Sequence, residues 1–295
     1  MKNENKKIKS GYVCIVGKTS VGKSSLLNKI LGEKISIISN KPQTTRKKNI
    51  GIFNDFDSQI IFVDTPGLHL RKNKLSDAMF KIIEREILNS DLILFMIESR
   101  LDNIDFDFIN KVKKINKTKI LVVNKIDKFD EDKINKLIID LDIKEFNSII
   151  KTSVKQEKNL DLLINKIKEN LSYGPKYFDN DILTQTSERE IVCELIREKV
   201  LFYLNQEIPH GVFVENNLFK KNIKKIYDLD FDICCERESH KKILIGANGK
   251  MIKKISIASR IETEKFLNSR ANLKLWVKVK KNWRNKDIYV NKILK

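Results

Sequence analysis

The sequence predicts an α/β domain with a mostly parallel sheet and helices on both faces, followed by a smaller α+β domain. Three observations predict this. Residues 11 to 170 alternate short apolar runs with helical patterns, as strands joined by crossover helices do. The segment Ser172-Tyr173-Gly174-Pro175 breaks that alternation. After it, one long helical pattern precedes several extended segments. A chain of 295 residues is long enough for each domain to bury its own core.

Domain boundaries follow from the same patterns. We place the first domain at residues 1–172, a linker at 173–185 and the second domain at 186–295. Apolar runs in the first domain predict strands at Tyr12–Val16, Ile60–Val63, Leu92–Ile97, Ile120–Val123 and Ser148–Lys151. We expect a helix after each strand, beginning near Lys23, Leu75, Asp105, Asp132 and Leu160.

The second domain opens with a helix-start signal, because Ser187 stands three residues before Glu190. Apolar residues then recur at helical spacing as far as Leu204. After this helix we expect two extended segments, a short apolar strand, a helix and a last strand. The strands are placed at Val212–Phe219, Asp230–Cys235, Lys242–Ile245 and Asn272–Lys280. We expect Trp276 in the core and leave Trp283 open between the core and a base-stacking surface.

Charge points to a polyanionic partner for the second domain. The formal charge is +19, and residues 241–295 hold 16 Lys and Arg against 3 Asp and Glu. This local excess of 13 leaves only +6 for the rest of the chain. A codon bias that favours lysine would spread the charge evenly along the chain, so it does not explain this concentration. No apolar run reaches bilayer length, and no secretory signal is expected. Four cysteines without zinc spacing predict inert thiols of a cytosolic protein.

A phosphate-binding loop is the most specific signal in the first domain. Glycines let successive backbone N–H groups approach phosphate, and the start of the next helix adds its positive end. Lys23 is expected to reach the β- and γ-phosphates, Ser24 to ligate Mg²⁺, and Ser25 to continue the binding segment. The motif G-x-x-x-x-G-K-[ST] is made by Gly17, Lys18, Thr19, Ser20, Val21, Gly22, Lys23 and Ser24.

A second motif selects guanine. The run Asn124-Lys125-Ile126-Asp127 follows an apolar strand. The carboxylate of Asp127 can accept from guanine N1–H and the 2-amino group, whereas adenine would leave it unpaired at a cost of about 1–3 kcal/mol per group. We expect the backbone N–H groups of Ser153-Val154-Lys155 to brace the base. The predicted ligands are therefore GTP and GDP.

Two further segments predict a switch that responds to the γ-phosphate. Asp64 ends a strand in Asp64-Thr65-Pro66-Gly67 and is placed to hold Mg²⁺ through water, while the Gly67 N–H contacts the γ-phosphate. The polar run Pro42-Gln43-Thr44-Thr45-Arg46 suits a first switch, with Thr45 closing onto Mg²⁺.

Hydrolysis is assigned to Lys23, Thr45 and Gly67. Leu68 stands where Ras-like proteins have a water-orienting glutamine, and we interpret His69 as a bystander. We therefore expect slow intrinsic turnover.

A G-x-x-G turn marks the second domain as RNA-binding. Without side chains at Gly246 and Gly249, a single-stranded backbone can come close. The expected RNA-binding residues are Ile245, Gly246, Ala247, Asn248, Gly249, Lys250, Lys253 and Lys254. This stretch resembles a KH domain.

The ordered motifs resemble the translation-factor class of GTPases, and Thr44-Thr45-Arg46 resembles its branch with Era and the tRNA-modifying GTPases. Similarity to the Era family extends over nearly the whole chain, through Asp64–His69, Gly174–Phe178, Ile196–Lys199 and Leu275–Lys280. The resemblance implies a P-loop GTPase followed by a type II KH domain. It implies binding near the 3′ end of 16S rRNA during small ribosomal subunit assembly. It further implies peripheral association with the inner membrane. Apart from the resemblance, we expect a cytoplasmic protein and favour a monomer.

The sequence departs from the family at two positions. Relatives usually carry an asparagine at the place of Ser20, where it helps to bind a stimulatory K⁺ ion, and an alanine at the place of Val154. Since a serine hydroxyl is a poorer ligand, we expect a weak response to K⁺. Two alternatives stay open. The second domain could chiefly bind a membrane or a protein, and the first could be a nucleotide sensor with negligible turnover.

Overall fold

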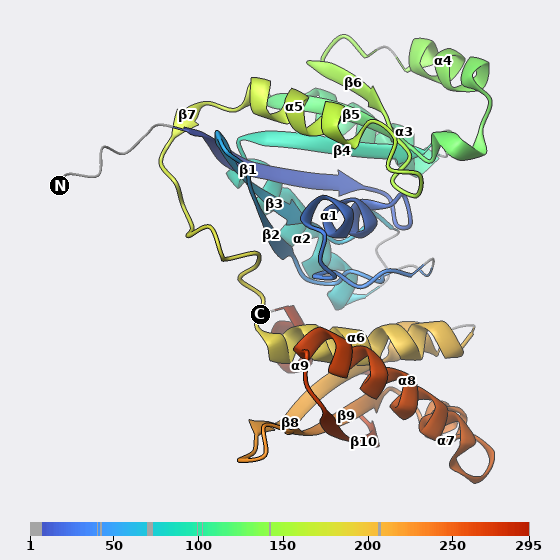
Figure 1. The fold of residues 1–295 in the computed structure, drawn as a ribbon. Helices are drawn as coiled ribbons and strands as arrows, with labels where there is room; N and C mark the ends of the chain where they lie inside the picture. The colour runs from blue at the N-terminus through green and yellow to red at the C-terminus, as the bar shows by residue number, and fades with distance from the viewer. Residues whose placement is uncertain are drawn as a thin grey trace, which may run out of the picture. The chain divides into compact units, whose positions relative to one another are not determined.

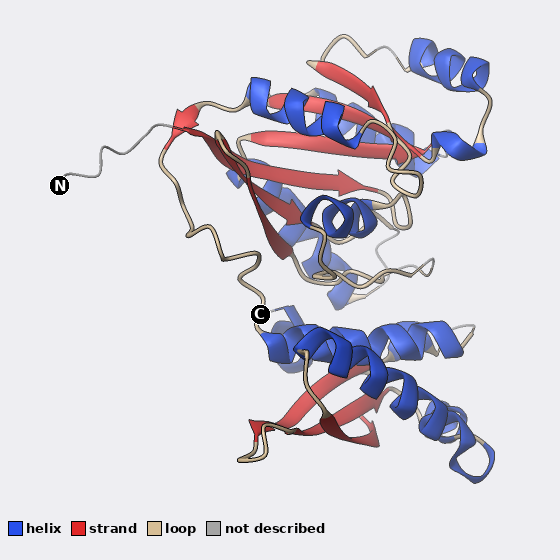
Figure 2. Cartoon of the chain, in the orientation of Figure 1, coloured by secondary structure: helices blue, strands red, loops and turns tan. Residues whose placement is uncertain are grey.

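The computed structural model describes residues 8–39, 41, 43–69, 73–98, 100–101, 103–141, 143–205 and 208–294. The chain forms two compact units. The first combines Met1–Ile35, Thr45–Leu70 and Met79–Gln185, and the second combines Ser36–Thr44, Arg71–Ala78 and Thr186–Lys295. Each unit has its own sheet and its own core (Figures 1 and 2).

The first unit is built on a twisted sheet with strand order β2-β3-β1-β4-β5-β6, and a short β7 pairs with β1. The strands from β3 to β6 run parallel along this order, whereas β2 is antiparallel to β3 and β7 to β1. The strands are β1 (Ile8–Gly17), β2 (Asn49–Asn54), β3 (Ser58–Asp64), β4 (Leu92–Glu98), β5 (Thr118–Asn124), β6 (Ser148–Lys151) and β7 (Tyr173–Gly174).

Helices cover both faces of this sheet (Figure 1). Side chains alternate between the faces of a strand. In β1, Val13 and Ile15 pack with α1 and α5, and Cys14 and Val16 face the core formed with α2, α3 and α4. The predicted α/β class is therefore confirmed. The helices are α1 (Lys23–Leu31), α2 (Lys74–Asn89), α3 (Asn103–Lys113), α4 (Glu131–Asp140) and α5 (Leu160–Asn170).

Strand β2 was not expected from the sequence. Its run of Asn49 to Asn54 is short and contains a glycine, which weakens the strand pattern. Packing explains the glycine. A Cβ added at Gly51 would lie 2.5 Å from Leu31 Cδ1 and 2.6 Å from Leu27 Cδ1 on α1. Glycine is therefore required at position 51 by the tertiary packing of α1 against the strand.

The second unit is α+β, as predicted. Its sheet has the order β10-β9-β8, with β8 and β9 antiparallel and β9 and β10 parallel. Helix α6 begins with the expected capping box of Ser187 and Glu190. Its apolar side packs with β9 and α8 in one core. The elements are α6 (Glu188–Tyr203), β8 (Phe213–Lys221), β9 (Tyr227–Cys235), α7 (Glu238–Ile245), α8 (Lys250–Leu267), β10 (Ala271–Val279) and α9 (Asp287–Leu294).

Two expectations for this unit were wrong. Lys242–Ile245 forms the end of helix α7 and not a strand, because a four-residue apolar run fits either element. Trp276 is 57% exposed, since it shares a face of β10 with Lys274 and Lys278. Trp283, in contrast, is buried and donates its indole N–H to the Gly211 carbonyl at 2.9 Å.

Candidate functional site

The phosphate-binding loop lies between the end of β1 and the start of α1 and requires its glycines. Gly17 and Gly22 have φ values of +153° and +108°, a region that side chains disfavour. A Cβ at Gly17 would lie 2.3 Å from the Met96 carbonyl oxygen. One at Gly22 would lie 2.4 Å from Asn124 Nδ2. Atoms of Met96 and Asn124 on neighbouring strands therefore leave no room for a side chain at these two positions.

Lys23 is the buried cation of this loop. Its Nζ donates to the carbonyl oxygens of Gly17 at 3.0 Å and Lys18 at 2.9 Å. Burial lowers the pKa of Lys23 to about 8, although the negative charge of Asp64 acts in the opposite direction. An anionic phosphate beside Nζ would favour the charged form, because an opposite charge offsets the cost of desolvation. The ammonium group is thus built to receive an anion.

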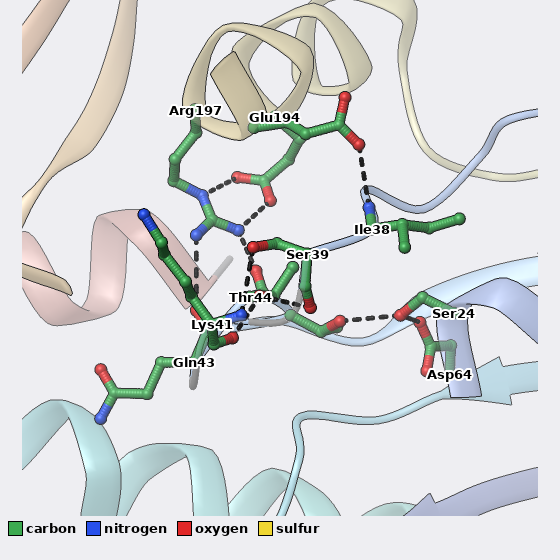
Figure 3. A network of polar contacts seen from close by, with 11 residues as sticks. Ser24, Ile38, Ser39, Lys41, Gln43, Thr44, Asp64, Glu194 and Arg197 are labelled. Carbon is green, nitrogen blue, oxygen red and sulfur yellow. Dashed lines mark hydrogen bonds and ion pairs between the residues drawn. The ribbon is translucent and has the colours of Figure 1, made fainter. Parts of the chain in front are cut away.

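Three oxygen-bearing side chains converge next to the loop. Ser24 Oγ lies 2.7 Å from Asp64 Oδ2 and 2.9 Å from Thr45 Oγ1 (Figure 3). Hydroxyl and carboxylate oxygens are the ligands that Mg²⁺ prefers. The donor set therefore fits the metal that the sequence predicted here. Within the predicted switch, Pro42 lies outside the described residues.

The segment after Asp64 packs directly on the phosphate loop. Thr19 N–H donates to Leu68 O at 3.3 Å, and Leu68 N–H donates to Gly17 O at 3.1 Å. A Cβ at Gly67 would lie 2.7 Å from Thr19 Cα, so only glycine permits this approach. The side chain of Leu68 is buried in the core. His69 Nδ1 lies 2.8 Å from Gly67 O, in a backbone contact.

The other residues of Asp64–Gly67 have structural contacts. The Thr65 hydroxyl is buried and donates to Ile15 O at 2.8 Å, and Pro66 is also buried. This segment is thereby fixed to the central strand.

Asn124 ties three loops together. Its Nδ2 donates to the Val21 carbonyl at 2.8 Å, and its Oδ1 accepts from Thr152 Oγ1 and Val154 N, both at 3.2 Å. The side chain is buried. The Val154 N–H donates to Asn124 here, and its contact with a guanine base stays a prediction. Asn124 therefore joins the phosphate loop to the loop after β6.

Asp127 and Lys125 lie on the segment after β5. Asp127 Oδ1 accepts from Ser153 Oγ at 2.6 Å, and this hydrogen bond is the main cause that lowers the pKa of Asp127. Lys125 has φ +63° and forms an ion pair of 2.8 Å with Glu98. The Asp127 carboxylate is thus kept charged and oriented, as an acceptor of two N–H groups must be.

The G-x-x-G turn of the second unit joins α7 to α8. Gly246 and Gly249 have φ values of +73° and +72°. A Cβ at Gly246 would lie 2.7 Å from Met251 Cβ, whereas one at Gly249 would have no atom of the described residues within 4 Å. The second glycine therefore leaves open space above the turn. The basic residues after it are exposed, and Lys254 Nζ lies 4.5 Å from the centre of the Tyr203 ring.

Sequence reasoning missed two contacts to these segments. Lys18 Nζ lies 3.6 Å from the buried carboxylate of Asp105 on α3. Arg197 on α6 is buried and donates to the carbonyl oxygens of Gln43 and Thr44. Both contacts join residues far apart in sequence, so no local motif signals them. A charged residue at an otherwise apolar helical position was the only hint for Arg197.

The fold and the sites define a P-loop protein of the guanine-nucleotide class joined to a KH domain. A family model described as "50S ribosome-binding GTPase" matches residues 12–125, and a KH domain model matches residues 207–284. GTPase Era of Clostridium tetani is 45% identical over 97% of this chain and 97% of its own length. GTPase Era of Clostridioides difficile is 46% identical over 96% and 97%. The chain belongs to the Era family of GTPases.

Two solved structures match both units. One is a point variant of Aquifex aeolicus Era bound to GDP and AlF₄⁻, with a TM-score of 0.92, 36% identity and coverage of 96% of this chain and 98% of that one. The other, with the same values, is Era in complex with MgGDPNP and nucleotides 1506–1542 of 16S ribosomal RNA. Among the described residues, no helix is both long and apolar enough to span a bilayer.

Proposed function

We propose that this GTPase is a switch that binds 16S rRNA near its 3′ end and assists assembly of the small ribosomal subunit. The observation that carries the proposal is the open G-x-x-G turn above Gly249, in a chain that matches an RNA-bound Era along both units. The excess of 13 basic residues within 241–295 supports a polyanionic partner.

GTP binding uses the loop between β1 and α1. Backbone N–H groups from Gly17 to Ser25 receive the phosphates, and Lys23 neutralises charge on the β- and γ-phosphates. Asp127 accepts from guanine, while Asn124 keeps the loops around the nucleotide together. Ser24 and Thr45 would hold Mg²⁺ directly and Asp64 through water. The ion supplies charge stabilisation at the phosphates.

Hydrolysis proceeds without a glutamine side chain. Leu68 is buried in the core, so its side chain orients no water. Gly67 has no side chain, which lets its backbone pack closely against Thr19. The Gly67 N–H contacts the γ-phosphate, and backbone groups of the switch place the nucleophile. Because this route uses neither a general base nor an arginine finger, we expect slow intrinsic turnover.

RNA binding uses the turn and the start of α8. The φ of +72° at Gly249 and the space above it let a phosphate backbone approach the peptide groups. Lys250 and Lys253 are exposed beside the turn and add positive charge. RNA affinity should therefore fall with salt at a slope of roughly −0.7 per phosphate contact.

The test adds charge at the turn without touching its glycines. Gly246 is a poor target, because a side chain there meets Met251. Ala247→Asp with Asn248→Asp places two carboxylates at exposed positions. The matched control, Ile288→Asp with Asn291→Asp on exposed positions of α9, changes the net charge equally. Filter binding with an oligonucleotide of the 16S 3′ end is measured for all three proteins, with GTP hydrolysis beside it.

We expect the turn variant alone to lose RNA binding by at least about tenfold, with hydrolysis in the free protein retained. Equal RNA affinity of the turn variant and the parent protein contradicts the proposal. In a parallel arm, the parent protein is mixed with anionic vesicles. Peripheral membrane association of a cytoplasmic monomer is part of the proposal, and stronger binding to vesicles than to RNA would favour a chiefly membrane-binding second domain.

A further inference from the structure

Residues Ile37 and Ile38, which precede the first switch, pack along helix α6 within the second unit. Ile37 is buried beside Ile191, Leu195 and Leu201. The backbone N–H of Ile38 donates to Glu198 Oε1 at 3.0 Å. These contacts fix the chain on α6 several residues before Thr45.

Within the switch itself, Arg197 holds Gln43 and Thr44 (Figure 3). Its side chain is 1% exposed, and its guanidinium forms a bidentate ion pair with Glu194. The remaining N–H groups donate to Gln43 O, at 3.4 Å, and to Thr44 O. A guanidinium keeps its charge at every physiological pH and presents donors in a rigid plane. Glu194 fixes the orientation of that plane, so the two carbonyls are bound in a defined place.

The backbone at Gln43 shows that this contact determines local geometry. Gln43 has φ +59°, a conformation that non-glycine residues adopt rarely and that persists when the surroundings stabilise it. The bond from Arg197 to the Gln43 carbonyl stabilises it. Thr45 follows one peptide after the Thr44 carbonyl, and its hydroxyl lies 2.9 Å from Ser24 Oγ. The position of Thr45 therefore depends on how Arg197 holds its two predecessors.

We propose that Arg197 is a positioning residue for the GTPase reaction, placing Thr45 for the metal and the γ-phosphate. The proposal rests on the function proposed above, in which Thr45 contacts the metal when GTP is bound. Because GDP lacks the γ-phosphate that draws the switch closed, Arg197 should support GTP binding and hydrolysis and contribute little to GDP binding. A helix of the RNA-binding half thereby contributes to discrimination between the two nucleotides.

The test compares four variants of the full chain. Arg197→Met removes the donors, and Arg197→Lys keeps the charge but not the planar fork. Arg189→Met replaces an exposed arginine of the same helix and is the matched control. Glu194→Leu with Arg197→Met removes the ion pair as a whole, which keeps the test usable if the single variant is unstable, since apolar replacement of a buried pair is often tolerated.

Affinities for GDP and for a non-hydrolysable GTP analogue are measured with the single-turnover rate and its Mg²⁺ dependence. We expect Arg197→Met and the double variant to lose about tenfold or more in analogue affinity, because two hydrogen bonds of a charged donor disappear. Their rate should fall and their Mg²⁺ requirement rise, with GDP affinity retained. Arg197→Lys should recover part of the loss, and Arg189→Met should match the parent protein.

Two outcomes overturn different claims. If the folded double variant keeps the parent ratio of analogue to GDP affinity and the parent rate, Arg197 does not position Thr45. If Mg²⁺ does not strengthen binding of the GTP analogue to the parent protein, and the parent protein does not hydrolyse GTP, the proposed role of Thr45 is wrong before any variant is compared.

Discussion

Replacing Asn124 by alanine should destabilise the first unit and weaken nucleotide binding together. The buried amide makes three hydrogen bonds, to Val21 O, Thr152 Oγ1 and Val154 N, and alanine leaves all three partners without it. At about 1 kcal/mol for each bond, plus the cost of buried groups that find no water, the loss is about 3–5 kcal/mol. For a unit of this size, such a loss lowers the melting temperature by about 6–20 °C.

The assay is thermal unfolding of the nucleotide-free protein, followed by titration with fluorescent GDP and a GTP analogue. Both nucleotides should bind more weakly by similar factors, because the phosphate loop loses its brace whichever nucleotide is present. Asn135→Ala is the matched control, since that amide also makes a side-chain hydrogen bond, with Lys151 Nζ at 2.6 Å, but is exposed. A melting temperature and GDP affinity equal to those of Asn135→Ala would refute the assignment of Asn124 as a brace.

Three further outcomes are expected. Asp127→Asn should weaken binding of GTP and strengthen binding of xanthosine triphosphate in competition assays, because the new amide N–H can donate to the 2-oxo group of xanthine. Unchanged GTP affinity would place Asp127 away from the base. Burial puts the folded-state pKa of Lys23, about 8, below its ordinary 10.5, so the penalty is complete below pH 8 and disappears as pH rises towards 10.5. In denaturation without nucleotide, the unfolding free energy of the parent protein should therefore rise, relative to that of Lys23→Met, as the pH increases from about 8 to 10.5. A difference between the two proteins that does not change with pH contradicts this prediction. Ser20 has φ +66°, which asparagine tolerates, so Ser20→Asn should fold normally and increase the response of phosphate release to KCl over NaCl; strong K⁺ stimulation of the parent protein would show that serine suffices.

Most of the first unit could be predicted because its strands are recognisable one at a time. All residues of β3 are buried, and six of seven in β4. A strand covered on both faces is apolar over most of its length, as Ile60–Val63 is in β3, so its sequence alone identifies it. The antiparallel β2 lacks this property, since Gly51 is required by α1 and not by the strand. The missed strand therefore marks a place where packing overrides local preference.

The same distinction separates the second unit's successes from its errors. The capping box at Ser187 is a local arrangement of four residues, and the structure contains it. Trp276 was misplaced because its size was weighed above the alternation of its strand, which sets it beside Lys274 and Lys278. The alternation was the better guide, because successive side chains of a strand point to opposite faces.

The sequence by itself determined the class of chemistry. The phosphate loop carries its own geometry, since consecutive backbone N–H groups and the glycines between them are adjacent in the chain. Tertiary structure alone decided how the motifs support one another. Asn124 bonds Val21 from 103 positions away, and Arg197 bonds Thr44 from 153. Such pairs form only after two separate elements have packed, and a side chain's own neighbours in sequence hold no record of that packing. Buried polar groups must nevertheless find partners, which is why these contacts, once the fold is known, identify residues that hold distant segments together.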